Sequence, residues 1–432
     1  QDQDTASPSI EDVRIGFGGL AKVGVWTPVR LTVAGGKQGF SGRILLRTPD
    51  SDGIPTYFAE SDEPAIKIAA GEKTTVWRYV KLGRTNARLN VSMRHDGGQI
   101  VDQQSISNFR ILKSTRQWVA VMGSDLRVEK ASRYLSRRSS ASLTKTVISD
   151  SRDLPDRWIG WEGINVLMLT TSEEGVLETI NEVQFSALRR WLQLGGQLVF
   201  TCGSRAAEVL GSDSPFSEFG PGKFEESVEN WRTVGMETFI RASKRVPDAT
   251  TRSPLAVFES VRGRVECYEA LGGINDRPVL MRYPFGFGRI TFLATDIEKP
   301  PLSDWVEHGQ LLARLIRFEA EEGDSTAGAD RLGQVTHVGF DDLTGQLRGA
   351  LDQFQGITLV RFSWIAALLV AYILLIGPLD FLGLRKLGRP HLTWVTFPLI
   401  VIVACLVAYL LSNQLKGRSS KINQVDLVDV DV

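Results

Sequence analysis

Cys202 is the residue whose type and position could support nucleophilic chemistry. It directly follows the apolar run Gln197 to Thr201 (QLVFT), which is typical of a buried strand. A nucleophilic cysteine at the end of a parallel strand needs small neighbours, because the turn that presents it is strained. Phe200 and Ser204 stand two residues before and after Cys202, and only Gly203 follows it directly. The surroundings of Cys202 therefore favour a buried, inert thiol.

A cysteine nucleophile also needs a base to accept its proton. The candidate late in the chain is His308, but the segment around it, WVEH, has the pattern of a helix rather than of a loop. Cys202, Cys267 and Cys405 lie far apart without the spacing of a disulfide framework or a zinc site, and the four histidines are scattered. We therefore assign no catalytic residue, no metal and no cofactor, and keep Cys202 as the candidate nucleophile. Whether Cys202 and Cys267 pair stays open.

Asp380 is an acid inside a long apolar run, just before the basic loop that holds Arg385, Lys386 and Arg389. An acid within a membrane span is costly and often takes part in proton or ion relays. Close to the end of a span it can instead reach the headgroup region or the loop. We favour this second interpretation, a salt bridge between Asp380 and the basic loop.

The composition of the chain limits the classes of function. Its 432 residues are enough for two or three domains, and Lys plus Arg equals Asp plus Glu, at 50 each. A nucleic-acid binder usually has a net positive charge, so we expect no nucleic-acid partner. The first residue is Gln1, and residues 1–9 are polar, which is consistent with a flexible mature N-terminus left by removal of a leader peptide.

Two long apolar runs near the end of the chain predict a transmembrane hairpin over residues 361–412. The spans are 362–384 and 392–411, and each is long enough to cross a bilayer as a helix. The basic loop between them predicts a cytoplasmic turn by the positive-inside rule, with residues 1–360 outside. Pro378 and Pro398 would bend the two helices at nearly the same depth, either as tolerated kinks or as a surface shaped for a partner's helices.

Residues 10–115 have the pattern of a β-sandwich. Apolar residues alternate with polar or small ones, as at Val29, Leu31 and Val33, and glycine-containing turn signals separate the alternating runs. Short strands at this spacing predict an immunoglobulin-like sandwich. The sequence DSDG at residues 50–53 looks like the start of a calcium loop, but the remaining ligand positions are absent, so we expect a plain turn.

Residues 116–321 have the pattern of a parallel α/β domain. Apolar runs that are typical of buried strands, such as WVAVMG from Trp118 and VLML from Val166, alternate with helical periodicity. A helix before Gly195-Gly196 leads into QLVFT, and RITFLA from Arg289 resembles a closing strand of the same sheet. Residues 212–285 interrupt the pattern, and we expect a partly β insertion there.

Two further segments complete the predicted organisation. Residues 322–360 are expected to form a linker and an amphipathic helix that packs on a protein surface. Residues 413–432 include an alternating apolar and acidic run, INQVDLVDVDV, which predicts a strand. A single strand leaves its edge unpaired, so we expect the natural chain to continue into a further exported β segment, or this strand to join the edge of the N-terminal sandwich.

The sequence also resembles known families over most of its length. The runs INVLML, LRRWLQLGGQLVF and FGFGRITFLATD resemble non-enzymatic versions of the class I glutamine amidotransferase-like fold. The hairpin GPLDFLGLRKLGRPHLTWVTFP resembles that of a bacterial envelope family with an exported β domain and such an α/β domain outside a two-helix anchor. Active amidotransferases have glycine two residues before and after the nucleophile, where this chain has Phe200 and Ser204. The resemblance therefore implies the architecture and not the activity.

Two hypotheses about function remain. The favoured one is a membrane-anchored, non-catalytic scaffold of the bacterial inner membrane, with the lipid bilayer and membrane or envelope proteins as partners. The alternative is a degenerate or unrecognised extracytoplasmic hydrolase of an amide, ester or glycan, which would require an activated thiol at Cys202. Glycan binding fits either hypothesis, and Trp26, Tyr57 and Trp77 could take part if they are exposed rather than core residues.

Overall fold

The structure is a computed structural model, and its parts divide into two compact units, residues 1–319 and 320–432. The chain has a mixed α/β fold with several sheets. The described ranges are 7–58, 65–136, 143–175, 177–229, 231–247, 253–269, 277–316, 362–387 and 392–416. The whole of the predicted linker (322–360) and most of the predicted terminal β segment (413–432) lie outside them.

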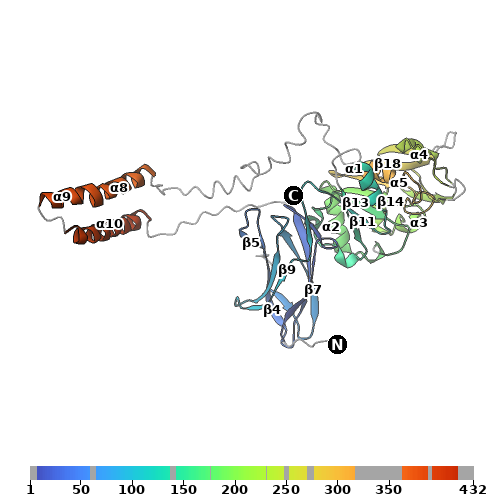
Figure 1. Ribbon diagram of the computed structural model, residues 1–432. Coiled ribbons are helices and arrows are strands. Elements are labelled where there is room, and N and C mark those ends of the chain that lie inside the picture. Colours follow the sequence, from blue (N-terminus) through green and yellow to red (C-terminus); the bar gives the residue numbers. More distant parts are fainter. Residues whose placement is uncertain are drawn as a thin grey trace. The chain divides into compact units, whose positions relative to one another are not determined.

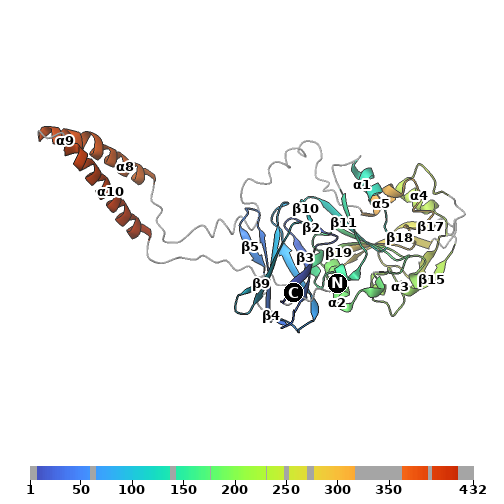
Figure 2. The ribbon, with the colours of Figure 1, turned by 60° about the horizontal axis from the view of Figure 1, so that its bottom comes forward.

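The first unit begins with two antiparallel sheets that enclose a shared core (Figures 1 and 2). Alternation along the strands makes this core, since Val29, Leu31 and Val33 all point into it and are fully buried. The smaller sheet has the order β1-β3-β7 and the larger β5-β4-β8-β9, with β6 also paired to β4. The strands are β1 (Ser9–Ile15), β3 (Trp26–Ala34), β4 (Phe40–Pro49), β5 (Pro55–Phe58), β6 (Ile66–Ile68), β7 (Lys73–Lys81), β8 (Leu89–His95) and β9 (Ile100–Ile106).

The DSDG stretch forms a turn between β4 and β5, as predicted. Asp50 Oδ1 accepts the backbone N–H groups of Asp52 and Ile54, both at 2.9 Å. An aspartate that binds the backbone two residues further on is a common way to stabilise a turn.

A seven-stranded sheet forms the centre of the α/β domain. Its order is β12-β11-β13-β14-β19-β18-β17, in which the first five strands are parallel and the last two antiparallel. β13 is buried along its whole length, which explains its continuous apolar sequence. The strands are β11 (Gln117–Met122), β12 (Leu143–Ile148), β13 (Val166–Thr170), β14 (Gln197–Thr201), β17 (Arg264–Glu269), β18 (Arg277–Phe285) and β19 (Gly288–Leu293).

Helices cover both faces of this sheet. Figure 2 shows α1 and α5 on one face and α2 on the other. α2 starts with a capping box in which Asn181 and Gln184 bind each other's backbone N–H groups, and this explains why the helix begins there. The helices of this domain are α1 (Glu129–Ser136), α2 (Glu182–Gln193), α3 (Ala206–Val209), α4 (Val234–Ile240) and α5 (His308–Ile316).

The predicted insertion at 212–285 is only partly separate from the main sheet. β15 (Phe224–Val228) and β16 (Leu255–Phe258) form a small sheet of their own. β17 and β18, however, extend the seven-stranded sheet beyond β19. The prediction that this whole segment interrupts the sheet is therefore wrong for 264–285, because these residues form an antiparallel extension rather than another parallel unit.

The sandwich and the α/β domain are joined by a short parallel pair, β2 (Leu20–Lys22) and β10 (Arg110–Leu112). The loop before β2 inserts Phe17 into the core of the α/β domain, where its ring lies 5.2 Å from that of Trp161. Since Phe17 is 1% exposed, the two domains share buried apolar surface.

The second unit contains two helical arms. The first arm runs from α8 (Phe362–Leu374) through a π-helical turn (Leu375–Leu379) into α9 (Asp380–Lys386), and the second is α10 (Thr393–Lys416). Pro378 lies in the π turn, as expected where proline removes a backbone donor. By length and composition the stretch Leu368–Lys386 could cross a membrane, while Thr393–Val407 is a shorter apolar helix. Helix α10 also continues past the predicted end of the span at residue 411.

Candidate functional site

The carboxyl ends of β13, β14 and β19 form a polar edge around Cys202. Asp296, just after β19, accepts the backbone N–H of Gly203 at 2.9 Å and that of Ser204 at 2.8 Å. Gly203 is required here, because a Cβ would lie 2.9 Å from the backbone of Thr295 and Asp296. The turn after Cys202 is thus tied to the loop after β19. Ligands of open α/β sheets usually bind at this edge.

The Cys202 thiol has the environment of an inert cysteine. The side chain is fully buried, and burial raises its pKa to about 12, with the charges of Asp296 and Glu298 adding to the increase. The thiolate is the reactive form, and at this pKa it is scarce at neutral pH. Cys202 and Cys267 are both free thiols.

His308 is the first residue of α5, whereas residues 305–307 of the segment predicted as helix precede the helix, so that prediction is confirmed only at His308. Both ring nitrogens of His308 contact backbone carbonyls. Its Nδ1 is 2.8 Å from the oxygen of Leu302, and its Nε2 is 3.3 Å from the oxygen of Leu126. Burial lowers the pKa of His308, so the ring is neutral at pH 7. Both nitrogens point at main-chain oxygens, and the structure does not join His308 to Cys202 as nucleophile and base.

Glu298 is the unusual acid of this edge, and the sequence did not point to it. The carboxylate accepts a hydrogen bond from Thr201 Oγ1 at 3.2 Å, while its Oε1 is buried with no hydrogen-bond partner among the described residues. Burial, followed by the charge of Asp296, raises the pKa of Glu298 to about 7. The Ser172 hydroxyl lies close enough to favour the charged form, although its geometry falls short of a hydrogen bond.

Two cations hold the loops around this edge. Arg205 binds Glu178 at 2.6 Å and Glu208 at 2.5 Å, and Lys299 donates to the carbonyl oxygen of Ser172 at 2.9 Å. Arg205 therefore ties the start of α3 to the loop after β13. No group of three or more His, Cys, Asp or Glu side chains suited to a metal occurs within the ranges that the structure describes.

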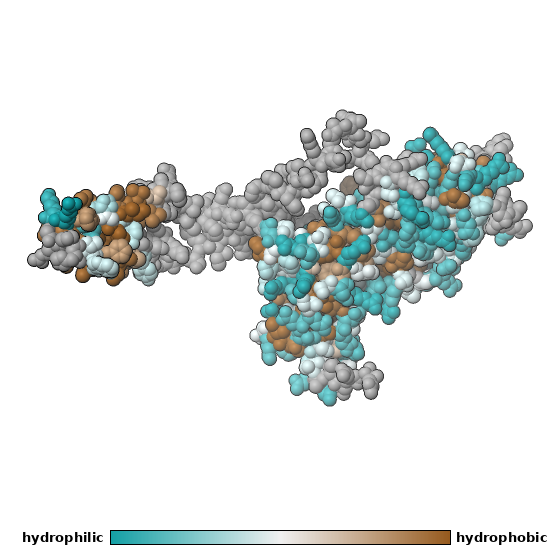
Figure 3. All heavy atoms as spheres, viewed as in Figure 1, coloured by the Kyte–Doolittle hydropathy of each residue, from teal (hydrophilic) through white to brown (hydrophobic). Residues whose placement is uncertain are grey.

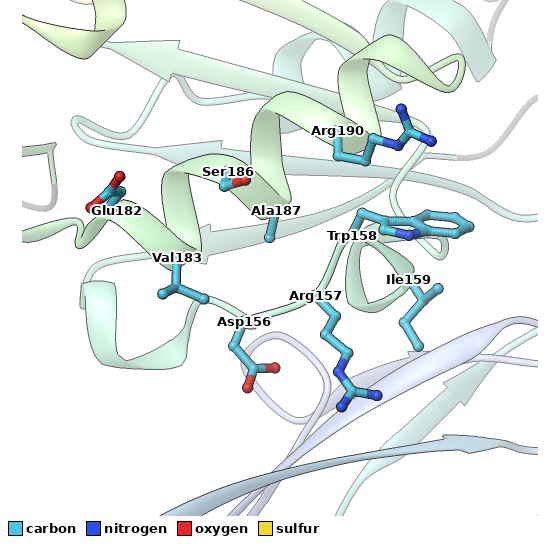
Figure 4. A pocket seen from close by; sticks show the side chains of 9 residues that line it. All are labelled: Asp156, Arg157, Trp158, Ile159, Glu182, Val183, Ser186, Ala187 and Arg190. Carbon is cyan, nitrogen blue, oxygen red and sulfur yellow. The ribbon is translucent and has the colours of Figure 1, made fainter. Parts of the chain in front are cut away.

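A second candidate place is a surface hollow of about 640 Å³ beside α2, close to the sandwich (Figure 4). Trp158 and Arg190 lie at one end of the labelled side chains and Glu182 at the other. The lining is mixed, with apolar residues between acids and bases. It comprises Asp156, Arg157, Trp158, Ile159, Glu182, Val183, Ser186, Ala187 and Arg190.

Polar contacts fix the sandwich to the wall of this hollow. Tyr79 in β7 donates its hydroxyl proton to Asp156 at 2.5 Å and accepts the backbone N–H of Arg157 at 3.0 Å. Arg30 in β3 binds Asp153 at 2.9 Å. Side chains of the sandwich therefore hold residues 153, 156 and 157 in position.

The aromatic residues considered for glycan binding lie in different environments. Trp26 is half-buried, with its ring 5.9 Å from that of Phe58 and 4.9 Å from Lys81 Nζ. Tyr57 is exposed, and Trp77 is half-buried. They belong to three different strands, and the hollow of Figure 4 contains none of them.

In the second unit, Asp380 contacts the other helical arm. Thr396 in α10 donates its hydroxyl proton to Asp380 Oδ2 at 3.1 Å. The predicted salt bridge with the basic loop is absent from the described residues, which include Arg385 and Lys386 but not Arg389. The acid instead stabilises the pairing of the two arms.

Comparisons with known proteins identify similar domains and structures but no function for this chain. Residues 8–108 match a family described as a domain of unknown function (DUF8726), and no curated protein matches. An exo-β-1,4-mannosidase, Op5Man5 from Opitutaceae bacterium strain TAV5, is 12% identical with a TM-score of 0.27 over 46% of this chain and 34% of its own. A Niemann-Pick type C2 protein from the Japanese carpenter ant is 7% identical with a TM-score of 0.19 over 26% of this chain and 97% of its own. The chain thus spans about a third of the length of the mannosidase.

Proposed function

We propose that this chain is a membrane-anchored, non-catalytic scaffold of the bacterial cell envelope. It presents an immunoglobulin-like sandwich and an amidotransferase-like α/β domain, both outside the inner membrane, to protein partners. In this proposal the helical hairpin is the anchor and the first unit is the binding body.

The observation that carries the proposal is the occupation of the carboxyl edge by the protein's own groups. In an acyl-transfer enzyme, the backbone N–H groups just after the nucleophile stabilise the developing oxyanion. Here the N–H groups of Gly203 and Ser204 are both bound by the carboxylate of Asp296. A negative charge in that position repels an oxyanion, and the preceding thiol is buried and protonated. The edge is thus built to be stable rather than to bind a reacting carbonyl.

The junction between the domains supports a scaffold as well. Phe17 is buried in the α/β core, and Tyr79 and Arg30 bind the segment that forms one wall of the hollow. Shared buried surface of this kind lets two domains present one continuous surface to a partner. Partner surfaces of scaffolds need such fixed geometry, because flexible surfaces lose entropy on binding.

The exposure of apolar side chains in the hairpin supports the anchor. Figure 3 shows brown, hydrophobic side chains on the surface of the two helical arms. Leu369, Ile373 and Val403 are about half exposed or more. In water this surface would be unfavourable, whereas in lipid it is matched by the acyl chains. The basic residues Arg385 and Lys386 at the turn support a cytoplasmic loop.

Cross-linking and mass spectrometry on the intact protein in mild detergent test the scaffold. We expect envelope or membrane proteins to be cross-linked reproducibly to lysines of the first unit, and the Cys202→Ser variant to retain the same set. A protein that stays monomeric, with cross-links to no other chain, would contradict the proposal.

One observation favours the hydrolase as a second candidate. Glu298 has a pKa of about 7, the range of a general acid or base, and lies at the edge where enzymes of this architecture bind substrates. A hydrolase that uses Glu298 would lose its activity on Glu298→Gln, and a panel of amide, ester and glycan substrates would reveal turnover by the unmodified chain. Turnover that survives Glu298→Gln would exclude this role.

A further inference from the structure

The edges of the sandwich are protected to very different degrees. β1 has a bulge between Ile10 and Asp12, and side chains of β9 bind its backbone, since Asp102 accepts the N–H of Ile10 and Gln104 donates to its carbonyl oxygen. β5 is four residues long and begins with Pro55. Bulges, prolines and short lengths are the usual means by which proteins prevent unwanted strand pairing.

β7 lacks these protections. It runs for nine residues without proline and pairs with β3 in an unbroken register from Trp26 opposite Lys81 to Ala34 opposite Lys73. It is the last strand of its sheet, so no described strand pairs with its other side. An edge of this length and regularity is suited to accept another strand.

The register identifies which backbone groups of β7 point outward. Gly16 donates to the carbonyl of Pro28 at 2.8 Å, so Pro28 faces β1 and the next residue, Val29, faces β7. Val29 is opposite Arg78, whose backbone therefore faces β3. By alternation, Thr75 and Trp77 direct their N–H and C=O groups to the outer edge.

Arg78 limits the length of edge that a strand can use. Its guanidinium donates to the outward carbonyl of Trp77 at 2.7 Å, and its side chain is buried. This contact agrees with the outward direction derived from the register. Lys73 and Thr75 are exposed before Arg78, whereas Arg78, Tyr79 and Val80 are buried, so the accessible edge is Lys73–Trp77.

The charges of β7 select an acidic strand. Lys73, Arg78 and Lys81 are its charged residues, and it has no acid. Lys73 binds Glu11 at 2.9 Å, with the lysine side chain 59% exposed and the glutamate side chain 31% exposed. An ion pair that solvent reaches in this way contributes little to stability, so an incoming carboxylate can replace Glu11. Arg78 is buried and Lys81 lies beyond the accessible edge, so Lys73 is the charge that a strand at Lys73–Trp77 would meet, and a basic strand would face this like charge.

We propose that the outer edge of β7, over Lys73–Trp77, binds an extended, acidic segment of a partner protein as an added β-strand. This inference rests on the proposed scaffold function and identifies one of its binding surfaces. Backbone hydrogen bonds to the N–H and C=O groups of Thr75 and to the N–H group of Trp77 supply the affinity, because the Trp77 carbonyl is bound by Arg78. The positive charge of Lys73 supplies the preference for a strand in which apolar and acidic residues alternate.

Binding of a fluorescent peptide, TVDVDVDT, to the full chain in detergent micelles tests the edge, with TVKVKVKT as the charge control. The decisive pair of variants is Thr75→Pro and Thr75→Ala. Proline removes an outward N–H without removing a bond to β3, whereas alanine keeps that N–H. We expect Thr75→Pro to weaken binding of the acidic peptide by about tenfold or more, and Thr75→Ala to leave it unchanged.

Equal binding of the acidic and basic peptides, or equal affinity of the proline and alanine variants, would overturn the proposal. If Thr75→Pro unfolds, Lys73→Glu replaces it, and we then expect weaker binding of TVDVDVDT and stronger binding of TVKVKVKT. If the peptide binds only after residues 421–432 are deleted, the chain's own acidic segment occupies the edge instead of a partner. This result would also overturn the proposal. If Thr75→Pro abolishes peptide binding but the protein is still cross-linked to the same partners, the scaffold function stands and the partners bind at a surface other than the edge of β7.

Discussion

Asp296 accepts the backbone N–H of Gly203 at 2.9 Å and thereby closes the turn that follows Cys202. The same carboxylate binds the N–H of Ser204, so one side chain satisfies two adjacent donors. The residue that follows β19 thus determines the conformation of the residues that follow β14. This relationship makes the carboxyl edge a structural feature whose loss has measurable consequences.

Replacing Asp296 by alanine should destabilise the first unit by about 2–4 kcal/mol, because two buried N–H groups lose a charged acceptor. The free energy of unfolding, from denaturant titration of the full chain in detergent, measures this. Asp304→Ala, at a neighbouring exposed carboxylate, is the control and should have a small effect. An Asp296→Ala variant as stable as the unmodified chain would show that the turn does not need this carboxylate.

The pKa of Glu298 predicts a pH dependence of stability. Its value of about 7 in the folded chain is above the ordinary value of 4.5, so the folded state binds this proton more tightly than the unfolded state does. The corresponding stability is present below about pH 4.5 and is lost as the pH rises through 7. The loss amounts to at most about 3 kcal/mol.

Denaturant unfolding at pH 5 and pH 8 measures this dependence, and Glu298→Gln, which cannot ionise, is the matched variant. We expect the difference between the two pH values to shrink in Glu298→Gln. An unchanged difference would assign the pH dependence to other groups.

The contact between Tyr79 and Asp156 predicts how firmly the domains are joined. Tyr79→Phe removes a buried hydroxyl that donates to Asp156 and accepts from Arg157, at a cost of about 1–3 kcal/mol. Because the ring remains, packing is preserved. Hydrogen exchange should then increase at residues 153–159 and remain unchanged in β13. Hydrogen exchange at residues 153–159 that is as slow in Tyr79→Phe as in the unmodified chain would contradict a coupling through this hydroxyl.

Parts of the fold follow from local sequence, and other parts depend on distant residues. QLVFT was predicted as a strand and forms β14, because the apolar residues Leu198, Val199 and Phe200 follow a helix stop. The segment that holds β17 and β18 was predicted to be partly β, but its pairing with the main sheet was not predicted, because bulges near Cys267 break the alternation of β17 that marks a strand. An irregular pairing leaves no period in the sequence.

In the candidate site, too, some features follow from local sequence and others depend on distant residues. The inert state of Cys202 could be predicted from its bulky neighbour Phe200. The raised pKa of Glu298 could not, because it arises from burial and from Asp296, contacts that exist only after β14 and β19 have paired. The contact of Asp380 with Thr396 depends likewise on the pairing of two helices. Asp296 had one sequence signal, its position just after a predicted strand in ATD.

The anchor proposal predicts a topology with both termini outside and the loop 385–391 in the cytoplasm. In a Cys405→Ser background, an impermeant thiol reagent on intact cells should label Ser325→Cys and should label Gly388→Cys only after the membrane is opened. Cys202 and Cys267 are buried and should stay unlabelled in the folded chain. Labelling of the loop from outside, with none at 325, would reverse this topology.

The most direct test of the scaffold is complementation of a deletion strain by the double variant Cys202→Ser, Glu298→Gln. This variant removes both candidate reactive groups of the carboxyl edge and keeps side chains of similar size. We predict full complementation with normal abundance, since the scaffold function uses surfaces and not these groups. A folded variant, present at the normal level and cross-linked to the same partners but unable to complement, would contradict the account and establish chemistry at this edge.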